Sequence, residues 1–444
     1  MSNHSARGSE LVRHNKFLRV PARIAPILCE ISRLQVSKGE SVRKIPFALP
    51  SISEHEIEAV VETLRSGWLT TGPKTKAFED AFAEAVGARH GLAVNSGTAA
   101  LHLALEALGI GSDDRVLVPT WTFTATADAV RNLGAHPVFV DVDPATLNID
   151  LARLEEQTLR LQREYGSKLK AVMPVHIGGQ ACEMDRIVSL ARLHDLKIIE
   201  DAAHAFPTTV ESETVADARR KRRMIGSISH ATAFSFYATK TLVTGEGGMV
   251  TTDDDLVARR IRLMRLHGID TDARSQDCSL PPSWYYEVIA PGFKYNLTDI
   301  ASSLGLVQLQ RMQEFLDQRV SIAQRYTAAF ANQPGLAPPL LRHAADVCAW
   351  HLYILRLNLE RIIINRNQFI RELEARGVGC SVHFIPLHLQ PYWRDCYGLS
   401  PSMFPVASRE FARVVSLPIY PGLDDRAVDR VIEVVLDVLS QVQR

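Results

Sequence analysis

Short apolar runs alternate with helical patterns along most of the chain. A helix that begins after a capping Ser51 or Ser53 carries apolar residues at 57, 60, 61 and 64, which is helical spacing. The strand-like runs that follow are 92–94, 116–118, 138–140, 171–173, 198–199, 233–236 and 249–251. This alternation predicts an α/β fold whose largely parallel sheet is covered by helices on both faces. Such sheets bind ligands at the carboxyl ends of their strands.

The pattern changes towards both ends of the chain. A long helical pattern from Asp299 through Leu316 should lead to a smaller C-terminal unit, with strand-like runs at 352–355 and 382–384 and a final helix over 426–442. Residues 1–45 hold nine Lys or Arg against three Glu, without a clear period. We therefore expect a poorly ordered basic extension over 1–45, although an arm that binds an anionic surface is an alternative. A large domain over 46–300 and a linker helix with a small α+β domain over 301–444 complete the expected organisation.

Composition excludes some classes of protein. The chain has 444 residues, of which 46% are apolar, with 50 basic and 50 acidic residues and a formal net charge of zero. Nothing in this balance favours nucleic acid as the main partner, and no run of about 18 apolar residues predicts a membrane span. The six cysteines are scattered without a C-x-x-C pair, so we expect reduced thiols in a cytoplasmic protein and no metal site.

One polar stretch interrupts the regular pattern. Residues 208–223 end in a run of five basic residues and contain few apolar positions. We expect a solvated surface loop there, and a contact to an anionic partner is the alternative.

The most informative chemistry lies around Lys240. This lysine ends the segment 235–240 and precedes a glycine-rich turn at 245–248, while an apolar run upstream ends in Glu200-Asp201. A lysine that can form a Schiff base, together with a carboxylate that keeps a pyridine nitrogen protonated, is what pyridoxal 5'-phosphate (PLP) requires. A solvated lysine and a helix-capping aspartate are the structural alternatives. The order of these residues predicts a PLP enzyme.

A phosphate site is predicted at Asn95-Ser96-Gly97-Thr98, which follows a strand and opens a helix. Gly97 allows close backbone approach, Thr98 adds a hydroxyl, and the helix N-terminus offers N–H groups and positive dipole charge to an anion. Alone this segment is also a good helix cap. Its place before Asp201, Ser235 and Lys240 makes the phosphate interpretation the stronger one.

Taken together, these motifs resemble the DegT/DnrJ/StrS group of PLP-dependent nucleotide-sugar aminotransferases. The resemblance extends over roughly residues 44–444 and rests on the segments 66–73, 95–98, 119–123, 200–204, 235–240 and 292–299. It implies the aspartate aminotransferase fold (fold type I), with a mainly parallel seven-stranded sheet between helices.

The resemblance also implies roles for individual residues. Lys240 is similar to the Schiff-base lysine that also moves protons, and Asp201 to the carboxylate at the pyridine nitrogen. The other implied cofactor contacts are Gly97, Thr98 and Ser235 at the phosphate, Phe123 on the ring face and His204 at the ring hydroxyl. For Phe123 a place in the core, and for His204 a structural role, are the alternatives.

Further residues are implied to contact the substrate or a second subunit. Lys294 and Asn296 resemble a segment that reaches the cofactor site of the neighbouring subunit, so a homodimer with shared sites is expected. Thr70, within the first motif, and His383 are expected near the sugar.

The function predicted in this way is transfer of an amino group from an amino acid, by family resemblance L-glutamate, to a nucleotide-linked keto-sugar. A UDP-4-keto-sugar is the expected acceptor. One alternative is a PLP-dependent sugar dehydratase of the same family, but that branch replaces the lysine with histidine, whereas this chain has Lys240. Another alternative is a non-catalytic regulatory protein with the PLP fold, which the intact set of Lys240, Asp201 and Thr98 argues against.

Overall fold

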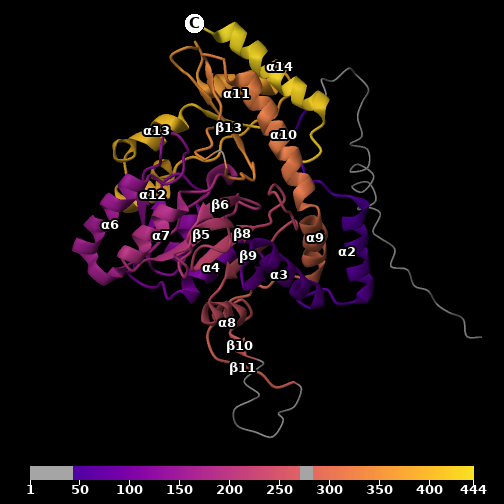
Figure 1. The fold of residues 1–444 in the computed structure, drawn as a ribbon, viewed down its shortest axis with the longest axis vertical. Helices are drawn as coiled ribbons and strands as arrows, with labels where there is room; N and C mark the ends of the chain where they lie inside the picture. The colour runs from indigo at the N-terminus through magenta and orange to yellow at the C-terminus, as the bar shows by residue number, and fades with distance from the viewer. Residues whose placement is uncertain (1–43, 271–283, 344) are drawn as a thin grey trace, which may run out of the picture. The chain divides into compact units, whose positions relative to one another are not determined.

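A seven-stranded sheet forms the centre of the fold (Figure 1). The structure is a computed structural model that describes residues 44–270, 284–343 and 345–444. In spatial order the strands are β1 (His90–Val94), β9 (Gly248–Thr252), β8 (Ala231–Ser235), β5 (Lys197–Asp201), β4 (Leu169–Val172), β2 (Arg115–Pro119) and β3 (His136–Val140). The pairs from β8 to β3 are parallel, and β9 runs antiparallel to both β1 and β8. All seven predicted strands lie in this sheet, which confirms the predicted fold class.

Helices cover both faces of the sheet because side chains alternate along each strand. In β1, Leu92 and Val94 join one hydrophobic cluster while Ala93 between them joins another. The first cluster packs under α4 (Gly97–Ala107), α5 (Ala125–Asn132) and α8 (Asp255–Met264). The second packs under α3 (Pro73–Val86), α6 (Leu151–Tyr165) and α7 (Met184–Leu193).

The N-terminal helix of the described chain begins where its sequence predicts. Ser53 caps α2 (Glu54–Ser66) with a capping box completed by Glu56. The long helical pattern from Asp299, in contrast, divides into α9 (Asp299–Gln310) and α10 (Met312–Phe330). Arg311 lies at the break, with φ −92° and ψ 3°, and its guanidinium forms an ion pair of 2.7 Å with the buried Glu56. Hydrophobic spacing is the same across both helices, so the sequence pattern could not reveal a break of one residue.

The C-terminal part has its own sheet and core. Its antiparallel strands are β12 (Leu336–Ala337), β13 (Tyr353–Leu357) and β14 (Val414–Leu417). Its helices are α11 (Arg366–Ala375), α12 (Pro391–Tyr397), α13 (Pro405–Phe411) and α14 (Asp425–Val442). It also contains the 3-10 turns η4 (Leu387–Leu389) and η5 (Pro401–Met403), while η1 (Gly166–Lys168) and η2 (Ile177–Gly179) lie earlier in the chain.

The strand predicted over 382–384 is wrong. Only Ser381 forms a bridge there, with Ser416. The carbonyl of His383 accepts from the Trp121 indole at 3.0 Å, and its Nδ1 lies 3.0 Å from the Ser416 hydroxyl. Because these groups bond to side chains, the segment does not form a continuous backbone ladder.

The polar stretch 208–223 is not the simple loop that was expected. Its two ends form an antiparallel pair, β6 (Thr209–Ser212) with β7 (Lys221–Met224). Of the basic run, Arg220 pairs with Asp185, and Arg219 and Arg223 pair with Asp217. These ion pairs stabilise the two ends of the stretch against each other and against α7. A further short pair joins β10 (Ile269–Asp270) and β11 (Glu287–Val288).

The predicted basic extension over 1–45 lies outside the described residues, apart from its last two. Ile45 is buried and bridges to Val378 of the C-terminal part. The domain limits at 46–300 and 301–444 stay predictions. In the described part of the chain, no helix is long and apolar enough to cross a membrane.

Candidate active site

A cavity of about 560 Å³ opens where β5 and β8 end and α4 begins. Eight of the predicted site residues line it, namely Gly97, Thr98, Phe123, Asp201, His204, Ser235, Lys240 and His383. Thr70, Lys294 and Asn296 are not among the lining residues. The cavity therefore lies at the carboxyl ends of parallel strands, as the fold class predicts.

One end of the cavity is suited to an anion. The side chain of the N-cap residue Ser96 accepts the Ala99 N–H at 3.1 Å. The N–H groups of Gly97 and Thr98 have no intrahelical acceptor because these residues begin the helix. A Cβ on Gly97 would lie 2.8 Å from the Cβ of Ser235, which is too close for any other residue without displacement. This end combines helix N–H groups with the hydroxyls of Thr98 and Ser235.

Asp201 is buried at the end of β5 and is held by two donors. Its Oδ2 accepts from the Thr126 hydroxyl at 2.7 Å, and its Oδ1 accepts from the Ala203 N–H at 3.1 Å. Thr122 lies 2.6 Å from the same Thr126 oxygen. Because the single Thr126 proton points at the carboxylate, Thr122 must be the donor in that second contact. Thr126 was not predicted as a site residue, although it lies four residues after Thr122 and three after the motif that ends at Phe123.

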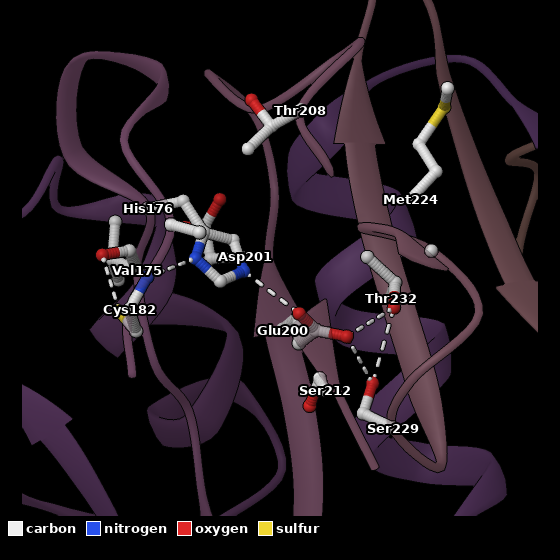
Figure 2. Close-up of polar contacts among 12 residues, drawn as sticks. Val175, His176, Cys182, Glu200, Asp201, Thr208, Ser212, Met224, Ser229 and Thr232 are labelled. Atoms are coloured by element: carbon white, nitrogen blue, oxygen red, sulfur yellow. Dashed lines mark hydrogen bonds and ion pairs between the residues drawn. The ribbon is translucent and has the colours of Figure 1, made fainter. Parts of the chain in front are cut away.

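The neighbouring carboxylate, Glu200, does not line the cavity and belongs to a buried network of polar contacts (Figure 2). It accepts from Ser229 at 2.7 Å, from Thr232 at 2.9 Å and from His176 Nε2 at 2.8 Å. The backbone N–H of Cys182 donates to His176 Nδ1 at 3.0 Å, so His176 donates to Glu200 through its Nε2–H. Since neighbouring strand residues face opposite sides, Glu200 secures β5 to β8 while Asp201 faces the cavity.

Lys240 reaches the cavity from the turn after β8. Its N–H donates to the Tyr237 carbonyl at 2.9 Å, and Thr241 beside it donates to the Phe206 carbonyl. Burial lowers the pKa of Lys240 to about 8, and the negative charge of Asp201 opposes part of that change. An amine with such a pKa is partly unprotonated near neutral pH and can act as a nucleophile or base.

His204 is fixed on three sides. Its Nδ1 accepts the Gly178 N–H at 3.3 Å, and the Phe384 ring stacks on it with centroids 5.7 Å apart. The ring of His351 lies on it at 4.3 Å. Burial, with the nearby Lys240, holds the pKa of His204 well below its usual range, so the ring is neutral and its proton is on Nε2.

Two further predicted residues differ in their surroundings. Phe123 is 56% exposed, so the alternative that placed it in the core is wrong. His383 stacks on Phe47 with centroids 5.1 Å apart, and burial and Lys240 lower its pKa to about 4. Both side chains line the cavity and neither belongs to the hydrophobic core.

The three residues outside the cavity lie at the surface around the 292–299 segment. Asn296 donates through Nδ2 to the Thr71 hydroxyl at 2.7 Å, and the Lys294 carbonyl accepts from Asn95. The side chains of Thr70 and Lys294 are exposed. Within one copy of the chain these residues do not line the cavity that contains Lys240.

The cavity residues fit PLP. The donors at the start of α4 match a phosphate, the carboxylate of Asp201 matches a protonated pyridine nitrogen, and the amine of Lys240 matches an aldehyde. Among the described residues, no group of His, Cys, Asp and Glu could hold a metal ion.

Comparisons with known proteins agree with this geometry. The model of the DegT/DnrJ/EryC1/StrS aminotransferase family matches residues 50–436. The spore coat polysaccharide biosynthesis protein SpsC of Bacillus subtilis (strain 168) is 47% identical over 397 residues, which are 89% of this chain and 97% of SpsC.

Solved structures give the same result. The PLP form of Spr1654 from Streptococcus pneumoniae, described as a sugar aminotransferase, is 33% identical with a TM-score of 0.79, over 90% of this chain and 99% of that one. PseC of Helicobacter pylori, an aminotransferase of pseudoaminic acid biosynthesis, is 26% identical with a TM-score of 0.78, over 90% of this chain and 100% of that one. The chain therefore belongs to the DegT/DnrJ/EryC1/StrS aminotransferase family, as a PLP-dependent sugar aminotransferase.

Proposed function

We propose that this protein transfers an amino group from an amino acid, L-glutamate, to a nucleotide-linked keto-sugar, at C4 of a UDP-linked sugar. The observation that carries this proposal is the meeting of Lys240 and Asp201 in one cavity of about 560 Å³, which has room for a sugar beside the cofactor. The relatives SpsC and PseC are named for polysaccharide and pseudoaminic acid biosynthesis, which supports an amino-sugar product.

The residues of the cavity divide the work between them. PLP, when bound, supplies an aldehyde and an electron-withdrawing ring. Gly97, Thr98 and Ser235 would bind its phosphate. Asp201, steadied by Thr126, would hold the proton of the pyridine nitrogen.

Lys240 has the second task. Its Nζ would accept a proton from the substrate carbon and later donate it to a carbon of the cofactor. An amine whose pKa is about 8 can do both near neutral pH. His204 would donate through Nε2 to the ring hydroxyl, and Phe123 would cover one ring face. Because amino donor and keto acceptor use the same site in turn, ping-pong kinetics are expected.

The binding of a donor carboxylate supports a homodimer with shared sites. Among the described residues that line the cavity there is one lysine, Lys240, and no arginine. A dicarboxylate such as glutamate needs cationic partners. Lys294 and Asn296, which lie outside the cavity of their own chain, would reach it from a second copy.

Exposed apolar side chains support the same assembly. Leu49, Ile57, Leu64, Trp68 and Leu69 are each about half exposed, in and beside α2. Apolar side chains clustered in this way are typical of an interaction surface. Thr70, next to Leu69, would then lie where the second copy and the sugar meet.

A cytoplasmic location is part of the proposal. Nucleotide sugars serve as its substrates, and Cys182, Cys348, Cys380 and Cys396 are free thiols.

The test is a screen of UDP- and dTDP-linked keto-sugars with L-glutamate, with the amino-sugar identified by mass spectrometry and NMR. Amine incorporation that depends on glutamate is the expected result, and Lys240→Ala is the control for catalysis. A sugar product formed without consumption of an amino donor would instead establish the dehydratase alternative.

A further inference from the structure

His351 lines the cavity but has no assigned role. It precedes β13 in the C-terminal part, 147 positions after His204, and its side chain is 6% exposed. Its Nδ1 is buried and has no hydrogen-bond partner. A buried polar atom without a partner is destabilising, and His351 is one of the residues that line the cavity, so a ligand bound there is the candidate partner for its imidazole.

Hydrogen bonds to the residues on either side of His351 hold its backbone in place. The Leu352 N–H donates to the Gly178 carbonyl at 3.2 Å, and the N–H of the same Gly178 donates to His204. Arg319 donates to the Trp350 carbonyl at 3.1 Å, immediately before His351. One glycine therefore bonds both to His204 and to the residue that follows His351, although the two histidines come from distant parts of the sequence.

Two backbone features show that this close approach is constrained. Trp350 has φ +48°, a left-handed conformation that is rare for a bulky residue and is found where surrounding structure enforces it. At Gly179, with φ +97°, a Cβ would lie 2.9 Å from the His204 carbonyl and 3.0 Å from the Trp350 N–H. The positive φ of Trp350 and the absence of a side chain at Gly179 accompany the close approach of His351 to His204.

The imidazole is uncharged in this setting. Burial, reinforced by His204 and Lys240, holds the pKa of His351 well below its usual range. A neutral imidazole has one N–H donor and one acceptor nitrogen, so it can form a hydrogen bond with a substrate oxygen without adding a charge to the cavity.

We propose that His351 binds substrate directly, through a hydrogen bond between its imidazole and an oxygen atom of the bound amino donor or keto-sugar. This inference rests on the proposed function, because it assigns a further binding residue to the same site. Both substrates offer an oxygen atom to which the imidazole can bond. The experiment below determines which of the two substrates His351 binds.

The test compares His351→Phe, which keeps an aromatic ring against His204 but removes both nitrogens, with wild-type enzyme. Single-turnover absorbance of the PLP-loaded enzyme against L-glutamate concentration measures donor binding, and the KM for a UDP-linked 4-keto-sugar reports the acceptor. We expect about a tenfold or greater weakening for one substrate, with the other substrate and the Kd of PLP changed less than twofold. His351→Gln, which retains a donor and an acceptor, should recover part of the loss and serves as the test variant if the Phe variant does not fold.

Thermal stability separates binding from a structural role. Because Nδ1 has no partner, the ligand-free His351→Phe protein should have a Tm equal to or above that of the wild type. The matched control is His388→Phe, at a buried histidine outside the cavity whose Nδ1 lies 2.8 Å from Thr120 and whose Nε2 lies 2.9 Å from Ser408. That substitution leaves partners unpaired, so its Tm should fall while both substrate constants stay unchanged.

Three outcomes would overturn the inference. Unchanged constants for both substrates would show that His351 does not bind substrate. A lower Tm in a His351→Phe protein that still folds without ligand would assign His351 a packing role, and a tenfold loss of PLP affinity would make the cofactor its partner. A wild-type enzyme that aminates no keto-sugar would contradict the proposed function instead, and the glutamate titration would still test His351 at the donor step.

Discussion

Thr126 donates a buried hydrogen bond of 2.7 Å to the carboxylate of Asp201. The two residues are 75 positions apart, and the helix α5 presents the threonine to the end of β5. The Ala203 N–H holds the other carboxylate oxygen, so the orientation of Asp201 is fixed before any ligand is present. This pair gives the first prediction.

Thr126→Val should remove the hydrogen bond to Asp201 while the valine side chain keeps the shape of threonine. A hydrogen bond to a charged group contributes about 1.5–3 kcal/mol, so we expect roughly a tenfold or greater loss in kcat. Thr126→Ser retains the hydroxyl and should stay near wild type. Steady-state kinetics of both variants check this, and equal rates for Val and Ser would contradict the role of the hydroxyl.

Lys240→Ala should abolish the absorbance band of the Schiff base between Lys240 and PLP and reduce turnover by at least about 10³-fold, within the range of lost proton-transfer catalysis. The fold should persist, because the substitution removes a buried amine whose pKa burial already lowers. Absorbance spectroscopy, kinetics and circular dichroism measure the three effects. The exposed Lys221→Ala is the matched control and should resemble wild type. Substantial amination by the Lys240→Ala protein would refute the assignment.

The uptake of PLP by the apo protein should depend on pH through Lys240. Only the unprotonated amine attacks an aldehyde, so the rate should rise about tenfold per pH unit below 8 and level off above it. The charge of Asp201 raises the pKa of Lys240, so Asp201→Asn should move the profile to lower pH. Stopped-flow absorbance from pH 6 to 10 measures both profiles. A shift to higher pH in the Asn variant would contradict the sign of this interaction.

Asp201→Asn should also lose most turnover while it binds some PLP, because a neutral amide does not keep the pyridine nitrogen protonated. Turnover and PLP content are measured on the same preparation. Near wild-type kcat in this variant would show that Asp201 does not act at that nitrogen.

Gly97→Ala should reduce PLP affinity by about tenfold or more, because the new Cβ would lie 2.8 Å from Ser235 Cβ and 3.2 Å from its hydroxyl. Alanine is a better helix former than glycine, so the fold itself should not suffer. Gly111→Ala is the control, since a Cβ there meets nothing within 4 Å. Fluorescence titration with PLP measures both, and equal affinities would place the phosphate elsewhere.

Mixed subunits test the shared sites. If Asn296 completes the site of a second copy, Lys240→Ala and Asn296→Ala proteins exchanged in equal amounts should recover about a quarter of wild-type activity through hybrid dimers. A mixture of Lys240→Ala with Asp201→Asn is the control and should recover nothing, because each hybrid site keeps one defect. No recovery in the first mixture, after subunit exchange is demonstrated by mass spectrometry, would contradict the shared site.

Local pattern was a good guide to the sheet and to the motifs at its edge. All seven strands of the central sheet were predicted, because each is an apolar run bounded by polar turns. The break at Arg311 and the absence of a strand over 382–384 were not, because an ion pair to Glu56 and bonds to Trp121 and Ser416 decide them. Those partners are more than 30 positions away in the chain.

By itself the sequence determined the strands of the central sheet, and it placed Lys240, Asp201 and Gly97 at strand and helix ends where a PLP site could assemble. Only the tertiary structure decided which polar groups meet there. Thr126 reaches Asp201, Gly178 sets the tautomer of His204, and His351 lies against that ring with an unpartnered nitrogen. The reason is physical: hydrophobic periodicity records which face of an element is buried, whereas a hydrogen bond depends on the relative position of residues far apart in sequence.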